Sequence, residues 1–142
     1  MAVIYGSKGS DTKNGTQGND TIYGWAKGGN TSSPSGNDTL NGLAGNDNLS
    51  GGTENDSLVG SQGEDTLNGQ AGNDTLDGGS SSDILNGGAG NDVYIVDSTG
   101  DKVTKADDSG TDTVRSFVSY TLGSNLENLT LQGTGALNGT GN

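Results

Sequence analysis

The chain of 142 residues contains no cysteine and no histidine, and only one proline, one phenylalanine and one methionine. Without cysteine there is no disulfide framework and no thiolate metal site. Without histidine the commonest general base and the usual nitrogen ligand of zinc and iron are missing. No apolar run approaches the roughly 18 residues that a membrane-spanning helix requires. These absences exclude membrane insertion by such a helix and leave oxygen atoms as the ligands for a metal.

Positive charge is also scarce, since six Lys and Arg residues face 18 Asp and Glu residues and give a net charge of −12. Such an acidic chain is a poor partner for nucleic acid or for an anionic membrane. Only 26% of the residues are hydrophobic and 28 are glycine, a composition typical of disorder when the net charge is high. The chain can therefore become ordered only if something neutralises its acidic groups.

What the chain has in abundance is one nine-residue repeat. Six consecutive copies run from Gly42 to Ile95: GLAGNDNLS, GGTENDSLV, GSQGEDTLN, GQAGNDTLD, GGSSSDILN and GGAGNDVYI. Position 1 is always Gly, position 6 is always Asp and position 8 is apolar. The same frame extends back to Gly6, which gives ten units, nine of them with Asp at position 6. The remaining unit, residues 24–32, is interpreted as degenerate, with Gly29 in place of Asp and Thr31 in place of the apolar residue.

Units such as GGAGNDVYI resemble the G-G-x-G-x-D-x-U-x nonapeptide of the RTX family, the hemolysin-type calcium-binding repeat. The resemblance covers about two-thirds of the chain. It implies a parallel β-roll that folds around Ca²⁺ in bacterial proteins exported by type I secretion, and hence a location outside the cell. The N-terminal sequence has no secretory h-region, but the family uses an uncleaved C-terminal signal.

The repeat also predicts how the chain folds. Positions 1 to 6 have turn composition, and positions 7 to 9 read as about three residues of strand whose middle side chain points inward. Two units form an 18-residue coil with two parallel sheets, so the predicted fold is all-β, a right-handed parallel β-roll (β-solenoid). One sheet is expected to present Ile22, Leu40, Leu58, Leu76 and Tyr94 inward, and the other Lys13, Thr31, Leu49, Leu67 and Leu85.

Three segments are expected: an N-terminal lead strand over residues 1–5, the ten-unit roll over 6–95 and a β-rich C-terminal capping segment over 96–142. In the capping segment we expect a short strand around Lys102 to Lys105, an alternating strand within Thr113 to Leu122, and an inward-facing set of Leu126, Leu129 and Leu131. Such a segment would cover the last open rung of the solenoid. The abrupt end suggests a fragment of a longer chain.

The Asp residues at position 6 are the candidate metal ligands. Neighbours in a column would lie about 4.8 Å apart, one coil from the next, and would repel each other unless a cation lay between them. Ca²⁺ takes 6–8 oxygen ligands from carboxylates and carbonyls, whereas Mg²⁺ demands tighter octahedral geometry. An all-oxygen set also suits Ca²⁺ better than Zn²⁺ or Cu²⁺. The predicted ligands are Asp20, Asp38, Asp47, Asp56, Asp65, Asp74, Asp83 and Asp92, with Gly36, Gly45, Gly63, Gly72 and Gly90 from position 4.

About six calcium sites are expected, between stacked Asp residues. The predicted pairs are Asp20/Asp38, Asp38/Asp56, Asp56/Asp74, Asp74/Asp92, Asp47/Asp65 and Asp65/Asp83. Glu54 and Ser81 replace the position-4 Gly, where a non-Gly residue would be strained, and Glu54 is a further candidate ligand. A purely structural role as a turn residue is the alternative for each Asp, but turns also accept Asn, Ser or Gly, which does not explain Asp in nine units.

The predicted function is a Ca²⁺-binding module that folds on binding calcium and serves as a structural domain of an exported bacterial protein. One alternative is an extracellular module that binds carbohydrate, a cell surface or ice, through the Thr residues at position 7 or through Tyr23 and Trp25. Another is a non-catalytic appendage of a secreted enzyme. Asp107 and Asp108 beside Ser109 lack a nucleophile–base arrangement, so no enzymatic activity is predicted.

Overall fold

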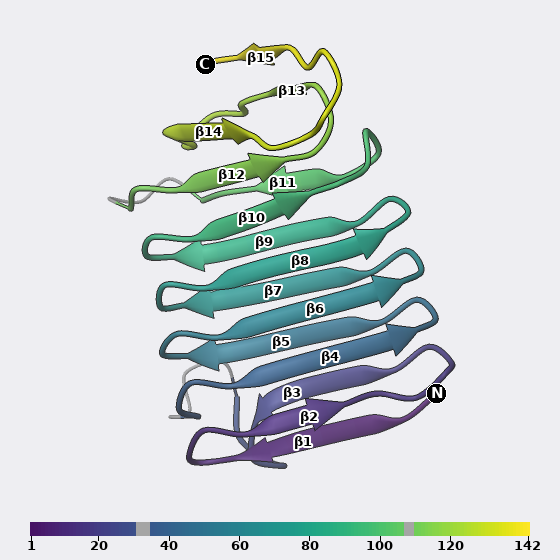
Figure 1. Ribbon diagram of the computed structural model, residues 1–142. Coiled ribbons are helices and arrows are strands. Elements are labelled where there is room, and N and C mark those ends of the chain that lie inside the picture. The colour runs from purple at the N-terminus through teal and green to yellow at the C-terminus, as the bar shows by residue number, and fades with distance from the viewer. Residues whose placement is uncertain (31–34, 107–109) are drawn as a thin grey trace.

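The computed structural model describes residues 1–30, 35–106 and 110–142. Thr31, Asp107, Asp108 and Ser109, which figure in the predictions above, lie outside these ranges. All regular secondary structure in the described ranges is β, and none of it is a helix that could cross a membrane. The strands form the rungs of a solenoid that rises from β1 at one end to β15 at the other (Figure 1).

Two parallel sheets face each other along the solenoid. We call them the odd sheet and the even sheet, because successive strands alternate between them. The odd sheet contains β1 (Val3–Ser7), β3 (Thr21–Trp25), β5 (Asn48–Thr53), β7 (Thr66–Ala71), β9 (Ile84–Ala89) and β11 (Lys102–Thr104). The even sheet contains β2 (Thr12–Asn14), β4 (Thr39–Ala44), β6 (Ser57–Gln62), β8 (Thr75–Ser80), β10 (Val93–Val96), β12 (Thr113–Ser116) and β14 (Asn128–Leu131). The predicted parallel β-solenoid is confirmed.

The strands are longer than the sequence suggested. Strands β4 to β9 have six residues each, from position 7 of one unit to position 3 of the next. In β7 the position-2 residue Gln70 has a φ of 85°, and it still pairs with Gly88 in the sheet. Only positions 4 to 6 form the turn. The prediction of three-residue strands was wrong because Gly and Ser, which favour turns elsewhere, here continue the strand past a local kink.

The core is a single file of side chains on each sheet. The apolar residue at position 8 is fully buried in both sheets, and the two files of side chains contact each other between the sheets. The odd sheet contributes Ile22, Leu49, Leu67 and Leu85, and the even sheet contributes Leu40, Leu58, Leu76, Tyr94 and Val114. Burying one such side chain stabilises the fold by about 2 kcal/mol. Because the core is so narrow, the stability of the fold also depends on interactions in the turns.

The register of the first coils differs from the prediction. Ile22 pairs with Leu49, and Lys13 pairs with Leu40, so both partners lie 27 residues apart. Ile22 and Lys13 therefore each lie in the sheet to which the prediction did not assign them, while Leu40 and Leu49 lie in their predicted sheets. Residues 26–30 and 35–38 contain no strand, and the N–H of Gly29 donates to Ala26 O at 2.8 Å in a turn. Within the unit interpreted as degenerate, Gly24 and Trp25 end β3, and residues 26–30 lie in the connection that follows it. The nine-residue frame of the sequence continues across this unit because the unit is one period long.

The strands of residues 96–142 extend both sheets. Strand β11 pairs with β9, and β12 and β14 pair in succession beyond β10. Val114, Leu122 and Leu126 are buried, and Leu129 packs against the core, as the alternation of apolar residues predicted. Leu131 is half-buried. Strands β13 (Tyr120–Thr121) and β15 (Gly139–Thr140) form a separate two-stranded sheet at the end of the solenoid.

Candidate metal centre

The position-6 aspartates form two columns, one at each edge of the roll. Column one lies at the turns that lead into the even strands, and column two lies at the turns that lead into the odd strands. Column one contains Asp11, Asp38, Asp56, Asp74, Asp92 and Asp112, and column two contains Asp20, Asp47, Asp65, Asp83 and Asp101. Every predicted aspartate ligand belongs to one of the columns.

One carboxylate oxygen of each aspartate ties its turn to the turn before it. The backbone N–H of Asp38 donates to Oδ1 of Asp56 at 2.8 Å, and that of Asp56 donates to Oδ1 of Asp74 at 2.8 Å. In column two the N–H of Asp47 donates to Oδ1 of Asp65 at 2.7 Å. These bonds satisfy buried backbone donors and fix which aspartates are neighbours. An asparagine could accept the same bond, so Oδ1 alone does not explain the choice of aspartate.

The second oxygen distinguishes the columns from ordinary turns. In seven aspartates Oδ2 is buried and has no hydrogen-bond partner among the described residues: Asp38, Asp47, Asp56, Asp65, Asp74, Asp83 and Asp112. Leaving a buried polar atom without a partner is costly, and more so for a charged one. A file of such oxygens is the arrangement expected where a cation is the partner.

The position-1 glycines make room for these oxygens. A Cβ on Gly69 would lie 2.3 Å from Asp74 Oδ2 and 2.7 Å from the carbonyl oxygen of Gly87. A Cβ on Gly60 would meet Asp65 Oδ2 and the carbonyl oxygen of Gly78 in the same way. Carboxylate and carbonyl oxygens thus converge on a space that any side chain would fill, which accounts for the Gly at position 1.

The position-4 residues present further carbonyl oxygens along the stack. Their φ values are positive in all five glycines that the sequence predicted as ligands: Gly36, Gly45, Gly63, Gly72 and Gly90. A Cβ on Gly63 would lie 1.9 Å from the carbonyl oxygen of Gly45 on the turn before it. Glu54 and Ser81 hold the same conformation at φ values of 70° and 101°, as predicted, which is strained for residues with a side chain.

Five of the six predicted Asp pairs are neighbours, and one is wrong. Asp20 is not stacked with Asp38: its N–H donates to Asp47 Oδ1 at 2.7 Å, while Asp38 Oδ1 accepts the N–H of Asp11 at 2.7 Å. The extra period between β3 and β4 causes this change of partner. Asp20 also differs from the interior aspartates because its Oδ2 accepts the Thr16 hydroxyl at 2.8 Å.

Glu54, the further candidate ligand, faces the turn before it. Its Oε2 accepts the N–H of Gly36 at 3.2 Å and that of Ser35 at 3.4 Å, as well as the Thr53 hydroxyl. The carboxylate therefore accepts hydrogen bonds from the backbone of that turn. Only the carbonyl oxygen of Glu54 takes a place equivalent to the carbonyl oxygens of the position-4 glycines.

An unrecognised ladder of asparagines runs beside column one. The N–H of Asn73 donates to the side-chain oxygen of Asn55 at 2.7 Å, and the N–H of Asn91 donates to that of Asn73 at 2.8 Å. Thr111 N–H continues the ladder to Asn91 at 2.7 Å. Asn at position 5 of the repeat is therefore structural, and its recurrence in the units was the signal that could have revealed it.

Burial and mutual repulsion perturb the carboxylates. Burial raises the pKa of Asp56 to about 8 and that of Asp74 to about 7, and the charge of a carboxylate on a neighbouring turn adds to the effect. Burial likewise raises the pKa of Asp38 and of Asp83 to about 6. The columns therefore favour neutral carboxyl groups in the folded chain unless a cation compensates for their charge.

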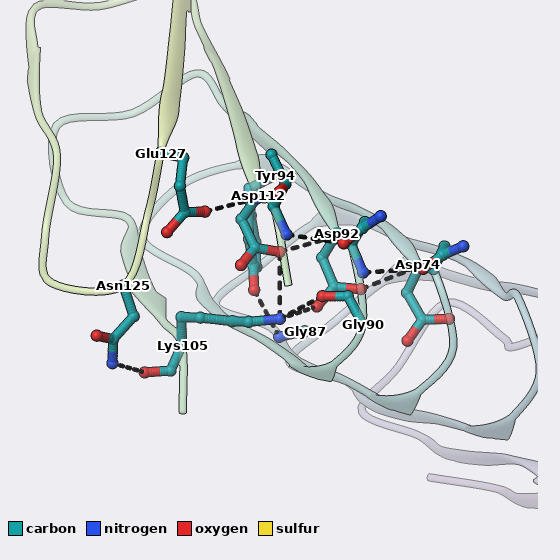
Figure 2. A network of polar contacts seen from close by, with 12 residues as sticks. Asp74, Gly87, Gly90, Asp92, Tyr94, Lys105, Asp112, Asn125 and Glu127 are labelled. Atoms are coloured by element: carbon teal, nitrogen blue, oxygen red, sulfur yellow. Dashed lines mark hydrogen bonds and ion pairs between the residues drawn. The ribbon is translucent and has the colours of Figure 1, made fainter. Parts of the chain in front are cut away.

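Sequence reasoning missed Lys105, whose side chain is fully buried. Its Nζ lies 2.9 Å from Asp92 Oδ2, 3.1 Å from Asp112 Oδ1 and 2.7 Å from the carbonyl oxygen of Gly90 (Figure 2). Burial alone would lower the pKa of Lys105, but the hydrogen bonds and charges of Asp92 and Asp112 outweigh it, and the pKa is raised. A single lysine after a short strand gives no sequence signal of this contact.

The donor set fits calcium. No three acidic side chains come together as a metal-binding group within residues 1–30, 35–106 and 110–142, so a metal ion in the columns would need backbone carbonyl oxygens beside the carboxylates. Calcium accepts that mixture in irregular geometry. The buried Oδ2 atoms, the carbonyl oxygens at the position-1 glycines and the position-4 carbonyl oxygens supply oxygens of both kinds.

The comparisons with known proteins agree with this geometry. A family model described as the RTX calcium-binding nonapeptide repeat (4 copies) matches residues 3–26, 35–67 and 59–94, which is more than half of the chain. The matched ranges omit residues 27–34, of which 27–30 lie in the connection that follows β3. The match describes a repeat and includes no catalytic domain. No curated protein matches the chain.

Proposed function

Because the chain belongs to the RTX calcium-binding nonapeptide repeat family, we propose that it folds as it binds calcium and serves as a folding module of a protein exported to the outside of a bacterial cell. The observation that carries this proposal is the row of buried, unpartnered Oδ2 atoms. Bound calcium would supply positive charge between carboxylates that otherwise repel each other.

We call a pair of aspartates on consecutive turns of one column a step. Six steps have the groups that a calcium ion requires. Each has a buried Oδ2 on one turn, an aspartate on the next turn and a position-4 carbonyl on the first. The six steps are Asp38/Asp56, Asp56/Asp74, Asp74/Asp92, Asp47/Asp65, Asp65/Asp83 and Asp83/Asp101. The steps that begin at Asp11 and Asp20 are left out, because the Oδ2 of each accepts a backbone N–H from its own turn.

Folding and binding are coupled in this proposal because neither the core nor the columns suffice alone. The core has one fully buried apolar side chain in each of strands β3 to β9, while ordering each residue costs about 1–2 kcal/mol of conformational entropy. Without a cation, the folded columns also bring ionised carboxylates together. Binding energy therefore becomes folding energy, as in other small metal-dependent domains.

The coupling suits export. Extracellular calcium modules typically bind at about 10⁻⁴–10⁻³ M, far above the calcium level inside a cell. A module of this kind would stay unfolded during passage through a secretion channel and would fold after reaching calcium outside. Family membership supports this role, and the acidic columns supply the calcium dependence that it needs.

Native mass spectrometry of the folded chain in calcium tests the proposal. We expect six calcium ions per chain in calcium, and no bound magnesium ions when magnesium replaces calcium in the solution. Asp56→Asn, which belongs to two of the six steps, should lose two ions, and Asp38→Asn, which belongs to one, should lose one. Asp97→Asn is the control, because Asp97 is exposed and lies outside the columns. A folded wild-type chain that retains no calcium would refute the proposal.

A further inference from the structure

Asp92 is the exception among the buried aspartates of column one. Its neighbours Asp74 and Asp112 each have a buried Oδ2 without a hydrogen-bond partner among the described residues. The Oδ2 of Asp92 instead accepts a hydrogen bond from Lys105 Nζ at 2.9 Å. The protein thus places its own cation at one step of a column whose other interior steps present unpartnered carboxylate oxygens.

The acceptors of Lys105 are those of a calcium step. They are one carboxylate oxygen from each of two consecutive turns, Asp92 and Asp112, and the carbonyl oxygen of the position-4 residue Gly90 (Figure 2). The ammonium group has three N–H donors, and these three acceptors lie within 3.1 Å of its nitrogen. The distances of 2.7, 2.9 and 3.1 Å are those of charge-assisted hydrogen bonds and close ion pairs.

The register of β11 explains how the side chain reaches this place. Thr104 pairs with Asn86, so Lys105 follows at the level of Gly87, a position-1 glycine. A Cβ on Gly87 would lie 2.1 Å from Asp92 Oδ2, which shows that position 1 faces the carboxylates. Strand β11 ends at Thr104, three residues shorter than the six-residue repeat strands. A long side chain at the next residue can therefore enter the turn where the repeats admit only glycine.

Charge balance also favours a cation between Asp92 and Asp112. Two buried carboxylates with nothing between them would be strongly unfavourable, and a buried ion pair is stable only when its geometry is good and its remaining hydrogen bonds are satisfied. Asp92 meets that condition, because its Oδ1 accepts the N–H of Asp74 and its Oδ2 accepts a hydrogen bond from Lys105. Asp112 contacts Lys105 through Oδ1, while its Oδ2 has no hydrogen-bond partner among the described residues. The N–H of Asp112 in turn donates to Glu127 Oε2 at 2.7 Å, which links this step to the strand beyond it.

We propose that the Lys105 ammonium group is a built-in cation that replaces calcium at the Asp92/Asp112 step. The proposal rests on the proposed function, since it assumes that the equivalent steps bind calcium. At this end of column one, the carboxylate charges of one step are therefore neutralised by the protein without a metal ion. The calcium-dependent part of column one then ends at Asp92, next to a turn that the chain neutralises by itself.

The test is the number of calcium ions on Lys105→Met, counted by native mass spectrometry in saturating calcium. Removing the ammonium group leaves two carboxylates and the Gly90 carbonyl facing one another, so we expect one more calcium ion per folded chain than in the wild type. Lys102→Met is the matched control: it removes the same charge three residues away at an exposed position, and it should bind the wild-type number.

An unchanged calcium count on folded Lys105→Met would overturn the inference while leaving the proposed function intact. A wild-type chain without calcium would overturn the proposed function instead, so the two failures are distinguishable. If Lys105→Met does not fold, Lys105→Glu, which adds a carboxylate, is tested in the same way and is also expected to gain one ion. Failure of both variants to fold in saturating calcium would overturn the inference, because calcium would then be unable to replace the ammonium group.

Discussion

The backbone N–H of Asp56 donates to Oδ1 of Asp74 on the next turn at 2.8 Å, while Oδ2 of Asp74 is buried with no hydrogen-bond partner among the described residues. The two oxygens of one carboxylate therefore have separate tasks. Oδ1 joins the turns, and Oδ2 is available to a cation. Substitutions that keep one task and remove the other can separate them.

Asp74→Asn retains an acceptor for the Asp56 N–H but removes the charge, whereas Asp74→Ala removes both. In calcium, we expect both variants to need more calcium to fold than the wild type, and Asp74→Ala to be less stable than Asp74→Asn by about 1 kcal/mol, the net contribution of one hydrogen bond. Urea unfolding at several calcium concentrations measures both effects. Asp97→Asn is the charge-matched control. Equal stability of the two Asp74 variants would contradict the separate role of Oδ1.

Acid should promote folding of the calcium-free chain. The pKa values of Asp38 and Asp83 are about 6, that of Asp74 is about 7 and that of Asp56 is about 8 in the folded state, against about 3.9 in an unfolded chain. A raised pKa in the folded state favours the protonated form, so this contribution to stability is present at low pH and is lost as pH rises through about 6 to 8.

Circular dichroism of metal-free protein should therefore show more β structure at pH 5 than at pH 8.5. In calcium the dependence should reverse, because protons compete with the metal ion for the carboxylates. A metal-free spectrum that does not change across this range, or that gains β structure at high pH, would contradict the role of buried carboxylates in opposing the calcium-free fold.

Gly69→Ala tests the space around Oδ2. Its Cβ would lie 2.3 Å from Asp74 Oδ2 and 2.7 Å from Gly87 O, so we expect the calcium-bound fold to lose about 2 kcal/mol, as for an overpacked core. The calcium concentration at half-folding should rise. Gly135→Ala is the control, since a Cβ there would have no heavy atom within 4 Å. Urea unfolding that gives the same stability for both variants would refute this explanation of the position-1 glycine.

The sequence was sufficient to predict the parallel solenoid, the buried apolar residues at position 8 and the stacking of the aspartates from Asp38 to Asp92, because all three follow from one period of nine. It was insufficient for the register of the first coils. The segment between β3 and β4 adds one whole period, so Asp20 and Asp38 remain in frame although Asp20 stacks on Asp47. Only the missing Asp and the missing apolar residue in that unit, replaced by Gly29 and Thr31, indicated an insertion.

The continuation of the columns past the repeats was partly visible. Asp101 lies in the nine-residue frame, 18 residues after Asp83, and could have been found by extending that frame. Asp112 lies 20 residues after Asp92, so two extra residues hide it from any periodic search. The contact of Lys105 with both Asp92 and Asp112 depends on that change of spacing and on the short strand β11, and neither feature can be predicted from the repeat.

The most direct test of the central claim is a calcium titration followed by far-UV circular dichroism, starting from the chain in excess chelator and with magnesium as the control ion. The account predicts a largely disordered spectrum in chelator, a cooperative transition to β structure on adding calcium, and no such transition with magnesium. The same β spectrum in chelator as in calcium would contradict it, because the columns would then tolerate their buried carboxylates without a metal ion.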